Sequence, residues 1–529
     1  MQKSGAAGVP VLISPSEPND LECGKCSAEE RGVMAVAVDE ASQLRAYGVE
    51  RRHDGLIYWK SDSTDHPRNW STVRKVFDTA VIIALEFYTT VISTTGASVA
   101  DTAGPEYGFE RRQALVAFTF MYQLGQAIGG CLIPPFSEVV GRRLPYLVSC
   151  AVFSIFCILT AVVPSPSLIY IGRFVTGFAS AAPSVVIAGS VEDIFNAKRR
   201  VWVVVLWNVG TTMGLCFGPV YATYITAMAG WRWVFYSAAI VTGVLFAALL
   251  AIKESRSSML LGRKILHIQR HTKISDLSWH NPDYSPHFRA LLDVVVVRPV
   301  TLLVTEPLVI MVAAISAVSW GIIYLFTESL ATIYGSIGFT KTQASLPFLA
   351  VALGTLLTLI PRFWDMRVVR ARQQKRELIQ PEDKIMGFAF AAPALAIGLT
   401  WFALTVPPLV TGLHWIVPTL ALIPIGFAVN ELAYTLSGYL SDSYLLYSAS
   451  AFSGLAFVRA IVSGLMPLIA DAMYTGLNSN IAGSILAAIS AAFCVVPWVF
   501  FRYSRKLRQR SPFACFSLET HRRTQVEMD

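Results

Sequence analysis

The chain has 529 residues, of which 54% are hydrophobic and only 15% are charged, and its mean hydropathy is +0.52. A soluble globular protein carries about 25% charged residues. The composition therefore excludes a soluble protein of two or three domains and predicts a polytopic membrane protein. The formal net charge of +8 does not by itself indicate nucleic-acid binding, because its meaning depends on where the basic residues lie.

The first 73 residues are polar and lack the apolar core of a cleavable signal peptide. We expect a largely disordered cytoplasmic tail that ends near Trp70, a residue suited to anchoring at the membrane interface. Cys23 and Cys26 form a CxxC pair in this tail, but no second Cys/His pair completes a tetrahedral metal site. No metal and no cofactor are therefore expected.

Twelve apolar segments follow the tail, and a helix needs about 20 such residues to cross a bilayer. They cover residues 76–97, 114–133, 145–163, 167–190, 201–223, 233–252, 302–326, 344–363, 386–406, 414–436, 448–470 and 481–501. A polar, basic segment at 253–298 divides them six and six. We expect an all-α protein of two six-helix bundles, residues 74–252 and 299–503, joined by this cytoplasmic central loop and followed by a cytoplasmic tail at 504–529.

The distribution of basic residues predicts the orientation. Of the 43 lysine and arginine residues, 37 lie in the tails and in loops on the same side of the membrane as the N-terminus. Four lie on the opposite side of the membrane, namely Arg111, Arg112, Arg232 and Lys341. The remaining two, Arg173 and Arg459, lie within spans. Because cytoplasmic loops carry the excess of lysine and arginine, both termini are predicted to be cytoplasmic, and no nucleic-acid partner is expected.

Residues 134–143 lie between the second and third spans and are predicted to form a charged ten-residue hairpin. Gly141 can adopt a tight turn that a Cβ would resist, and Glu138 is close enough in sequence to pair with Arg142 and Arg143. An ordinary cytoplasmic loop would also explain the two arginines. The whole pattern, an acid, two spacers, glycine and a basic pair, resembles the loop 2–3 motif of the major facilitator superfamily.

The fourth span contains an arginine, in Arg173-Phe174-Val175-Thr176-Gly177. A charge at membrane depth is costly and marks a functional candidate. Arg173 lies about six residues from the outer end of the span, roughly 9–10 Å deep, so an arginine that snorkels to the surface is the structural alternative. Arg173 with Gly177 resembles the span 4 motif of proton-coupled members of the superfamily.

The fifth span contains Gly210, Gly214, Gly218 and Pro219. Small residues four apart allow helices to approach closely, and a proline removes a backbone hydrogen bond. Gly214, Gly218 and Pro219 together resemble the motif that distinguishes antiporters of the superfamily, although the closing glycine pair of that motif is replaced here. The resemblance favours export over import.

Further motifs occur in the same order as in fungal twelve-span drug:proton antiporters, which the chain resembles over about residues 60–510. They lie at 231–235, 253–256, 305–307, 439–444 and 448–451, followed by Arg459. The resemblance implies a substrate site between the two bundles near the membrane midplane. It also implies that Asp442, at the cytoplasmic end of its span, helps to lock the loop 2–3 motif against the second bundle.

Glu86 lies about ten residues into the first span, roughly 15 Å deep and so near the midplane. On a helix it shares a partly polar face with Thr79, Ile82, Ile83, Thr90 and Ser93. Burial favours the protonated acid and a nearby cation favours the carboxylate, so such a group can bind and release protons. The resemblance implies that Glu86 and Arg173 together couple transport to protons; a buried structural ion pair is the alternative.

Other polar and aromatic residues fall on spans that could face the same cavity. The candidates for contact with substrate are Thr90, Ser93, Trp320, Tyr324, Glu328, Glu431 and Arg459. Aromatic rings suit flat or cationic organic compounds. Glu306, Glu328 and Glu431 can equally form gating or capping contacts, and the partner of Arg459 stays open at this point. His267 and His271 lie four residues apart in the central loop, without a third metal ligand.

The sequence predicts a monomeric plasma-membrane carrier, with the vacuolar membrane as an alternative location, that exports a small organic compound in exchange for protons. A proton-coupled uptake carrier is the first alternative. A multispan membrane enzyme and a non-transporting receptor are the others. The enzyme requires a cluster of histidine and aspartate or a nucleophile within the membrane, whereas seven of the eight histidines lie in tails or cytoplasmic loops.

Overall fold

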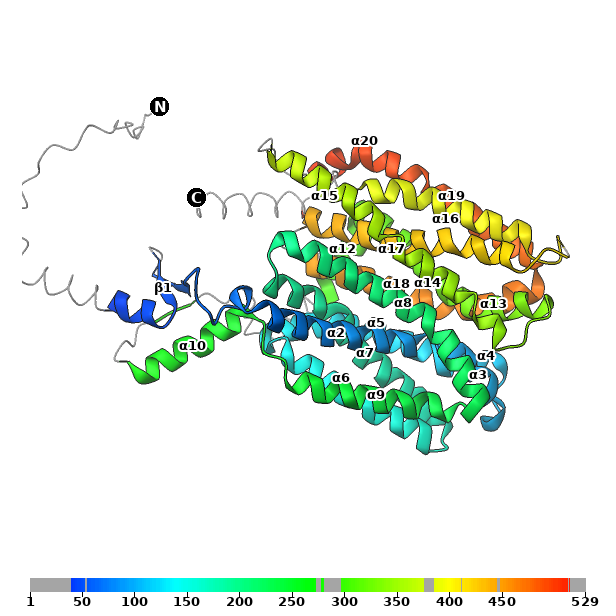
Figure 1. Cartoon of the computed structure of the whole chain (residues 1–529), viewed down its shortest axis with the longest axis horizontal. Helices are drawn as coiled ribbons and strands as arrows, with labels where there is room; N and C mark the ends of the chain where they lie inside the picture. The colour runs from blue at the N-terminus through cyan, green and yellow to red at the C-terminus, as the bar shows by residue number, and fades with distance from the viewer. Residues whose placement is uncertain are drawn as a thin grey trace, which may run out of the picture. The chain divides into compact units, whose positions relative to one another are not determined.

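The computed structural model describes residues 40–52, 55–272, 277–279, 296–374, 385–410, 412–444, 448–511 and 513. These residues belong to two units, a small unit drawn from residues 1–63 and 264–280 and a membrane unit drawn from residues 64–263 and 281–529 (Figure 1).

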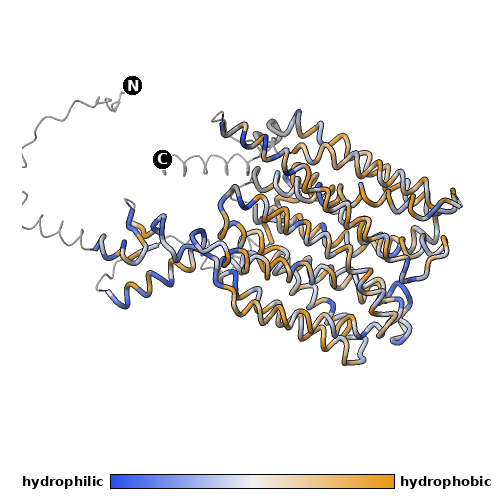
Figure 2. Tube along the Cα trace, viewed as in Figure 1, coloured by the Kyte–Doolittle hydropathy of each residue, from blue (hydrophilic) through white to orange (hydrophobic). Residues whose placement is uncertain are grey.

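Within the described residues of the membrane unit, twelve helical spans are long and apolar enough to cross a bilayer, as predicted. Figure 2 shows that hydrophobic residues predominate along these helices. In lipid every backbone N–H and C=O group must be bonded within the protein, and a helix satisfies this condition by itself.

The first six spans form the N bundle. Their helices, with the short elements between them, are η1 (Pro67–Asn69), α2 (Thr72–Ser93), α3 (Gly96–Ala103), η2 (Pro105–Tyr107), α4 (Arg111–Leu115), η3 (Val116–Phe120), α5 (Met121–Val140), α6 (Arg143–Val162), α7 (Pro166–Ile194), α8 (Ala197–Ala229) and α9 (Arg232–Leu250). The elements α4, η3 and α5 are continuous and make the second span, with η3 in the wider π-helical form.

The last six spans form the C bundle, which follows α10 (Ser257–His271) and α12 (Arg298–Thr305). Its elements are α13 (Pro307–Ser336), η5 (Gln343–Ser345), α14 (Phe348–Leu356), α15 (Leu359–Gln374), α16 (Met386–Thr405), α17 (Ile416–Tyr444), α18 (Ser448–Gly476), α19 (Ser479–Phe493) and α20 (Val495–Arg510). Pro307 opens α13, so the seventh span begins later and ends later than the predicted 302–326.

The same glycine contact occurs once in each bundle and reveals an internal repeat. In the N bundle, Gly125 of α5 lies against the backbone of α7, and Gly177 of α7 lies against the carbonyl of Tyr122 in α5. In the C bundle, Gly354 of α14 and Gly426 of α17 lie against each other's helices at the same spacing. The second and fourth spans of each half therefore cross at a point where only glycine fits.

The turn between the second and third spans is shorter than predicted. Helix α5 continues through Pro134 and Pro135 to Val140, so residues 134–140 are helical and not part of a hairpin. The chain reverses at Gly141, whose φ of 102° lies in the region that favours glycine. The two prolines are adjacent in the same turn of this helix, a continuation that the sequence pattern alone did not indicate.

The small unit corrects the prediction of a disordered tail for its described part. Strands β1 (Val49–Arg51) and β2 (Ile57–Trp59) form an antiparallel hairpin. The residue before β2, Leu56, pairs with Ser278 of the central segment, and the amide of Ile57 donates to the carbonyl of Ser278 at 3.0 Å. Two segments more than 200 residues apart in sequence form this unit. The sequence of either segment by itself therefore does not predict a folded structure. Residues 1–39 lie outside the described part of the chain.

We expect Gly177→Ala to lower the apparent melting temperature of the purified protein, because the added Cβ would meet the backbone carbonyl of Tyr122. Overpacking of this kind costs about 1–3 kcal/mol. Gly243→Ala is the matched control, since Gly243 is an exposed helical glycine whose Cβ would meet nothing within 4 Å. There the gain of about 0.5–1 kcal/mol for alanine over glycine in a helix should raise the melting temperature or leave it unchanged. Equal effects of both substitutions would contradict the crossing.

Candidate functional site

The carboxylate of Glu86 on α2 is buried within the N bundle, with 2% of the residue exposed. Thr90 donates to the backbone carbonyl of Glu86 at 2.7 Å and approaches its Oε1 at 3.4 Å. The hydroxyls of Ser184 on α7 and Thr211 on α8 also lie close to the carboxylate. Hydroxyls from three helices thus surround Glu86, which faces the inside of the protein and not lipid.

The cation that faces Glu86 is Arg459 on α18 of the C bundle. The two groups interact electrostatically, yet they are not within the 4.0 Å of a direct ion pair. The guanidinium of Arg459 lies 4.1 Å from the centre of the Trp320 ring on α13, which holds it in a cation–π contact. The structure therefore identifies the neighbours of Arg459, Glu86 and Trp320, which the sequence left open.

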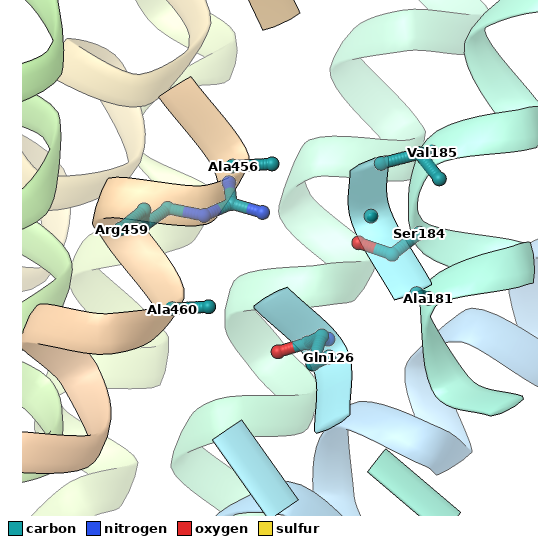
Figure 3. A pocket seen from close by; sticks show the side chains of 8 residues that line it. Gln126, Ala181, Ser184, Val185, Ala456, Arg459 and Ala460 are labelled. Atoms are coloured by element: carbon teal, nitrogen blue, oxygen red, sulfur yellow. The ribbon is translucent and has the colours of Figure 1, made fainter. Parts of the chain in front are cut away.

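A small cavity separates the two bundles at Arg459. Its walls include Gln126 of α5 and Ser184 of α7 on one side and Ala456 and Ala460 of α18 on the other. Figure 3 shows the guanidinium of Arg459 extending from α18 toward Ser184. The space is of the order of one water molecule, so the two bundles are nearly closed around it.

The predicted contact between Glu86 and Arg173 does not form in this conformation. Arg173 is 1% exposed, donates to the carbonyls of Phe118 at 2.7 Å and Ile92 at 3.4 Å, and lies 4.5 Å from the centre of the Tyr122 ring. It does not snorkel either. Phe118 belongs to the π-helical segment η3, where the irregular pairing leaves backbone carbonyls available to side chains.

Span 5 packs on span 1 through the glycine–proline motif. A Cβ at Gly214 or Gly218 of α8 would collide with the backbone of α2, so both helices approach at glycine. Pro219 has no N–H for the carbonyl of Leu215, and the hydroxyl of Thr94 on α2 donates to that carbonyl at 3.1 Å. The motif thereby fixes α8 beside the helix that carries Glu86.

The loop 2–3 motif is bound to the end of span 6. Backbone amides of Arg142 and Arg143 donate to the two carboxylate oxygens of Glu254 at 2.8 and 3.0 Å. The guanidinium of Arg142 donates to the hydroxyl of Ser137 at 2.6 Å and pairs with Asp193 at 3.4 Å. We call this region the Arg142 end of the membrane unit.

The predicted pairing of Glu138 with the two arginines is wrong, because these other carboxylates take its place. Glu138 lies on α5, before the turn at Gly141 directs Arg142 toward α7. Asp193 also pairs with Arg256 at 3.7 Å. Burial, with Arg142 close by, lowers the pKa of Arg256. The sequence feature that could have indicated these partners was the acidic residue at the end of span 4, Asp193, and at the end of span 6, Glu254. The side chain of Asp442 lies outside the described part of the chain.

At the opposite end of the second span, the two bundles are joined by an ion-pair network that we call the Arg111 end. Arg111 pairs with Asp101 of the N bundle and with Glu328 of the C bundle. Lys341 lies 3.7 Å from Asp101, and the hydroxyls of Ser93 and Tyr324 are 2.8 Å apart. Ser93, Tyr324 and Glu328 therefore make contacts between bundles and do not line the cavity at Arg459.

The comparisons with known proteins agree with this architecture. A family model described as Major Facilitator Superfamily matches residues 81–464. The chain belongs to this superfamily. This confirms the resemblance inferred from the motifs, and the chain is accordingly a multi-pass membrane transporter.

Similar superfamily members are named as fungal efflux or multidrug transporters. The chain is 28% identical over 454 residues to "Multidrug transporter TPO1_2" of Candida glabrata, covering 85% of this chain and 78% of that one. It is 29% identical over 476 residues to "Ascochitine biosynthesis cluster MFS transporter" of Didymella fabae, with 87% and 90% covered. The solved structure of the proton:xylose symporter XylE bound to 6-bromo-6-deoxy-D-glucose has a TM-score of 0.55 at 14% identity, covering 82% and 96%, and shares the fold.

The major facilitator fold of this chain also buries a second carboxylate, Glu431 on α17, away from Arg459. Glu431 pairs with Arg362 of α15, whose guanidinium also pairs with Asp365 at 2.6 Å and lies 4.0 Å from the centre of the Tyr434 ring. Arg362 was missed because it lies near the predicted end of its span. Another acid, Glu306, accepts a hydrogen bond from Tyr444 at 3.0 Å, so both acids make structural contacts here.

We expect Glu328→Gln to loosen the Arg111 end of this transporter, because Arg111 would lose its charged partner on the other bundle. Labelling of a cysteine at Ser93 by a water-soluble thiol reagent should accelerate several-fold, since about 1–2 kcal/mol of pairing is lost. Glu106→Gln is the control: it removes the exposed Arg232–Glu106 pair at 2.9 Å within the N bundle and should leave the rate unchanged. An unchanged rate in Glu328→Gln would contradict a role in closure.

Proposed function

We propose that this transporter exports a small organic compound from the cytoplasm in exchange for protons, by alternating access. The observation that supports it most is the position of Glu86, a buried carboxylate surrounded by hydroxyls and opposed by Arg459 across the bundle interface. A protonatable group at such an interface can be exposed to either side in turn as the bundles rock. Glu86 is the proton-binding residue of this proposal.

The bundle contacts at both ends describe a closed state between the two open ones. At the Arg111 end the bundles meet through the Arg111–Glu328 pair. Toward the Arg142 end they meet through the rings of Trp202 and Phe363, whose centres are 5.6 Å apart. Opening one end requires only the contacts at that end to break, so the two ends can open in turn.

The direction and orientation are supported by separate observations. Basic residues dominate the segments on the side of the Arg142 end, which supports a cytoplasmic position for that end and for both termini. Gly214, Gly218 and Pro219 resemble the antiporter motif, and relatives carry names such as "Multidrug transporter TPO1_2" and "Efflux pump radE". The proton then moves inward, and each charge that crosses 100 mV supplies about 2.3 kcal/mol.

Arg173 has an indirect role in this proposal. It fixes the second span and the first at carbonyls of Phe118 and Ile92 and supports the ring of Tyr122. The hydroxyl of Tyr122 in turn donates to the carbonyl of Thr89 on the helix of Glu86 at 2.9 Å. Arg173 thus positions α2, and we propose that it affects proton coupling through that helix. The carrier acts as a monomer in the plasma membrane, without a cofactor or a catalytic reaction.

We expect Glu86→Gln to abolish proton-coupled export, because an amide cannot take up a proton in the physiological range. The measurement uses everted plasma-membrane vesicles with an imposed pH gradient and compounds to which a strain lacking the transporter is hypersensitive. Addition of a transported compound should dissipate the gradient in the unmodified protein, and the rate in Glu86→Gln should be at least about tenfold lower.

Exchange of labelled for unlabelled compound, which needs no proton, should persist in Glu86→Gln. Glu192→Gln is the charge-matched control, since Glu192 is an exposed carboxylate paired with Arg200 at 2.8 Å; it should retain full proton coupling. Unchanged coupling in Glu86→Gln would remove Glu86 from the mechanism. Proton-driven accumulation in right-side-out vesicles would instead identify an uptake carrier.

A further inference from the structure

Arg459 has a charged head group that the described part of the protein does not satisfy. Among the described residues it has no ion pair within 4.0 Å and no hydrogen bond, and its guanidinium lies 4.1 Å from the centre of the Trp320 ring. A guanidinium has five N–H donors, and a charge at membrane depth is costly unless it is bonded. Arg173 and Arg362, which are each 1% exposed, both donate to oxygen atoms.

The donors of Arg459 point into the cavity between the bundles. The cation–π contact with Trp320 uses none of the N–H groups as hydrogen-bond donors to oxygen, so they stay available. Figure 3 shows that edge directed across the space toward Ser184, with the amide of Gln126 on the same far wall. A planar fork of donors matches two oxygens of a carboxylate, which is the geometry that arginine binds best.

A carboxylate, that of Glu86, lies next to the opposite wall without lining the cavity. Ser184 contributes both to that wall and to the surroundings of Glu86. The carboxylate of Glu86 has one oxygen, Oε2, without a hydrogen bond from the described residues. The membrane unit thus holds a cation that lines the cavity and a partly satisfied anion next to its far wall, one on each bundle and too far apart to pair directly.

We propose that this cavity binds an ampholytic organic compound, with an acidic oxygen group bound by Arg459 and a protonated amine directed to Glu86. This inference rests on the proposed exchange of compound for protons and specifies the class of compound. Trp320 and Gln126 complete the site, the first by holding the guanidinium and the second as a polar wall residue. The compound enters when the bundles separate, since the closed state leaves little space.

The charges of such a compound fit the exchange cycle. When the compound is bound, its acidic and donor groups offset Arg459 and Glu86, so the buried site carries no net charge. Protonation of Glu86 removes the negative charge that attracts the donor group, which weakens one of the two anchors and favours release. A compound with only a negative charge would instead bind together with the proton, because Arg459 would need to be free of the Glu86 charge. That behaviour would give cotransport and not exchange.

The electrostatic character of the cavity can be measured without knowing the compound. The reporter is Ala456→Cys, at a cavity-lining position one turn from Arg459, in a full-length protein whose native cysteines are replaced by alanine. The probes are the sulfonatoethyl and trimethylammonioethyl methanethiosulfonates, which are anionic and cationic. The ratio of their labelling rates is normalised to the ratio for a free thiol.

We expect the normalised ratio to favour the anionic probe in the parent protein and to favour it more in Glu86→Gln. In Arg459→Gln it should reverse, because Glu86 then remains as the charge at the cavity. Each rate should change by about tenfold for a unit charge at roughly 8 Å in an effective dielectric of about 30. Arg459→Lys, which keeps the charge, should resemble the parent, and it keeps the test valid if Arg459→Gln does not yield monodisperse protein.

Arg232→Gln is the charge-matched control, because it removes a positive charge from an exposed position; its ratio should equal that of the parent. A ratio that is insensitive to Arg459 or to Glu86 would overturn the amphoteric site, as would failure of both probes to label Ala456→Cys. The result is independent of proton flux. A protein that fails the vesicle test but shows the reversal keeps this site and loses the exchange mechanism.

Discussion

The cost of an unsatisfied polar group in a low dielectric controls how this protein is built. Arg173 is bonded to backbone carbonyls that a π-helical segment makes available, and the carbonyl that Pro219 leaves unpaired accepts from Thr94. In each case an irregularity in one helix is satisfied by a side chain on another. The polar groups therefore fix which helices are neighbours, while the apolar surface only keeps them in the membrane.

Against this background the pair Glu86 and Arg459 stands out functionally. Both groups are deep in the protein, they belong to different bundles, and they influence each other without touching. A structural ion pair would gain most from direct contact. In the mechanism that we propose, the gap between them leaves each charge able to respond to a third participant, a proton at Glu86 and a ligand at Arg459.

The close helix crossings give this site a rigid frame. Glycine contacts between α5 and α7 and between α14 and α17 recur at the same spacing in both bundles, and the cavity lies where α5, α7 and α18 meet. Rigid bundles can move against each other as units. The ion pairs at the Arg111 end and the ring contact at the other end then act as separate closures of one interface.

The sequence by itself determined the twelve spans, their division into two sets of six, the family and the burial depth of Glu86, because hydropathy and motif spacing are local properties. Only the tertiary structure decided the partners. It placed Arg459 and not Arg173 opposite Glu86, bound Arg142 to Asp193 instead of Glu138, paired Glu431 with Arg362, and built a small unit from two distant segments. The physical reason is that a partner is set by the rotation and crossing of packed helices, and residue depth alone does not contain this information.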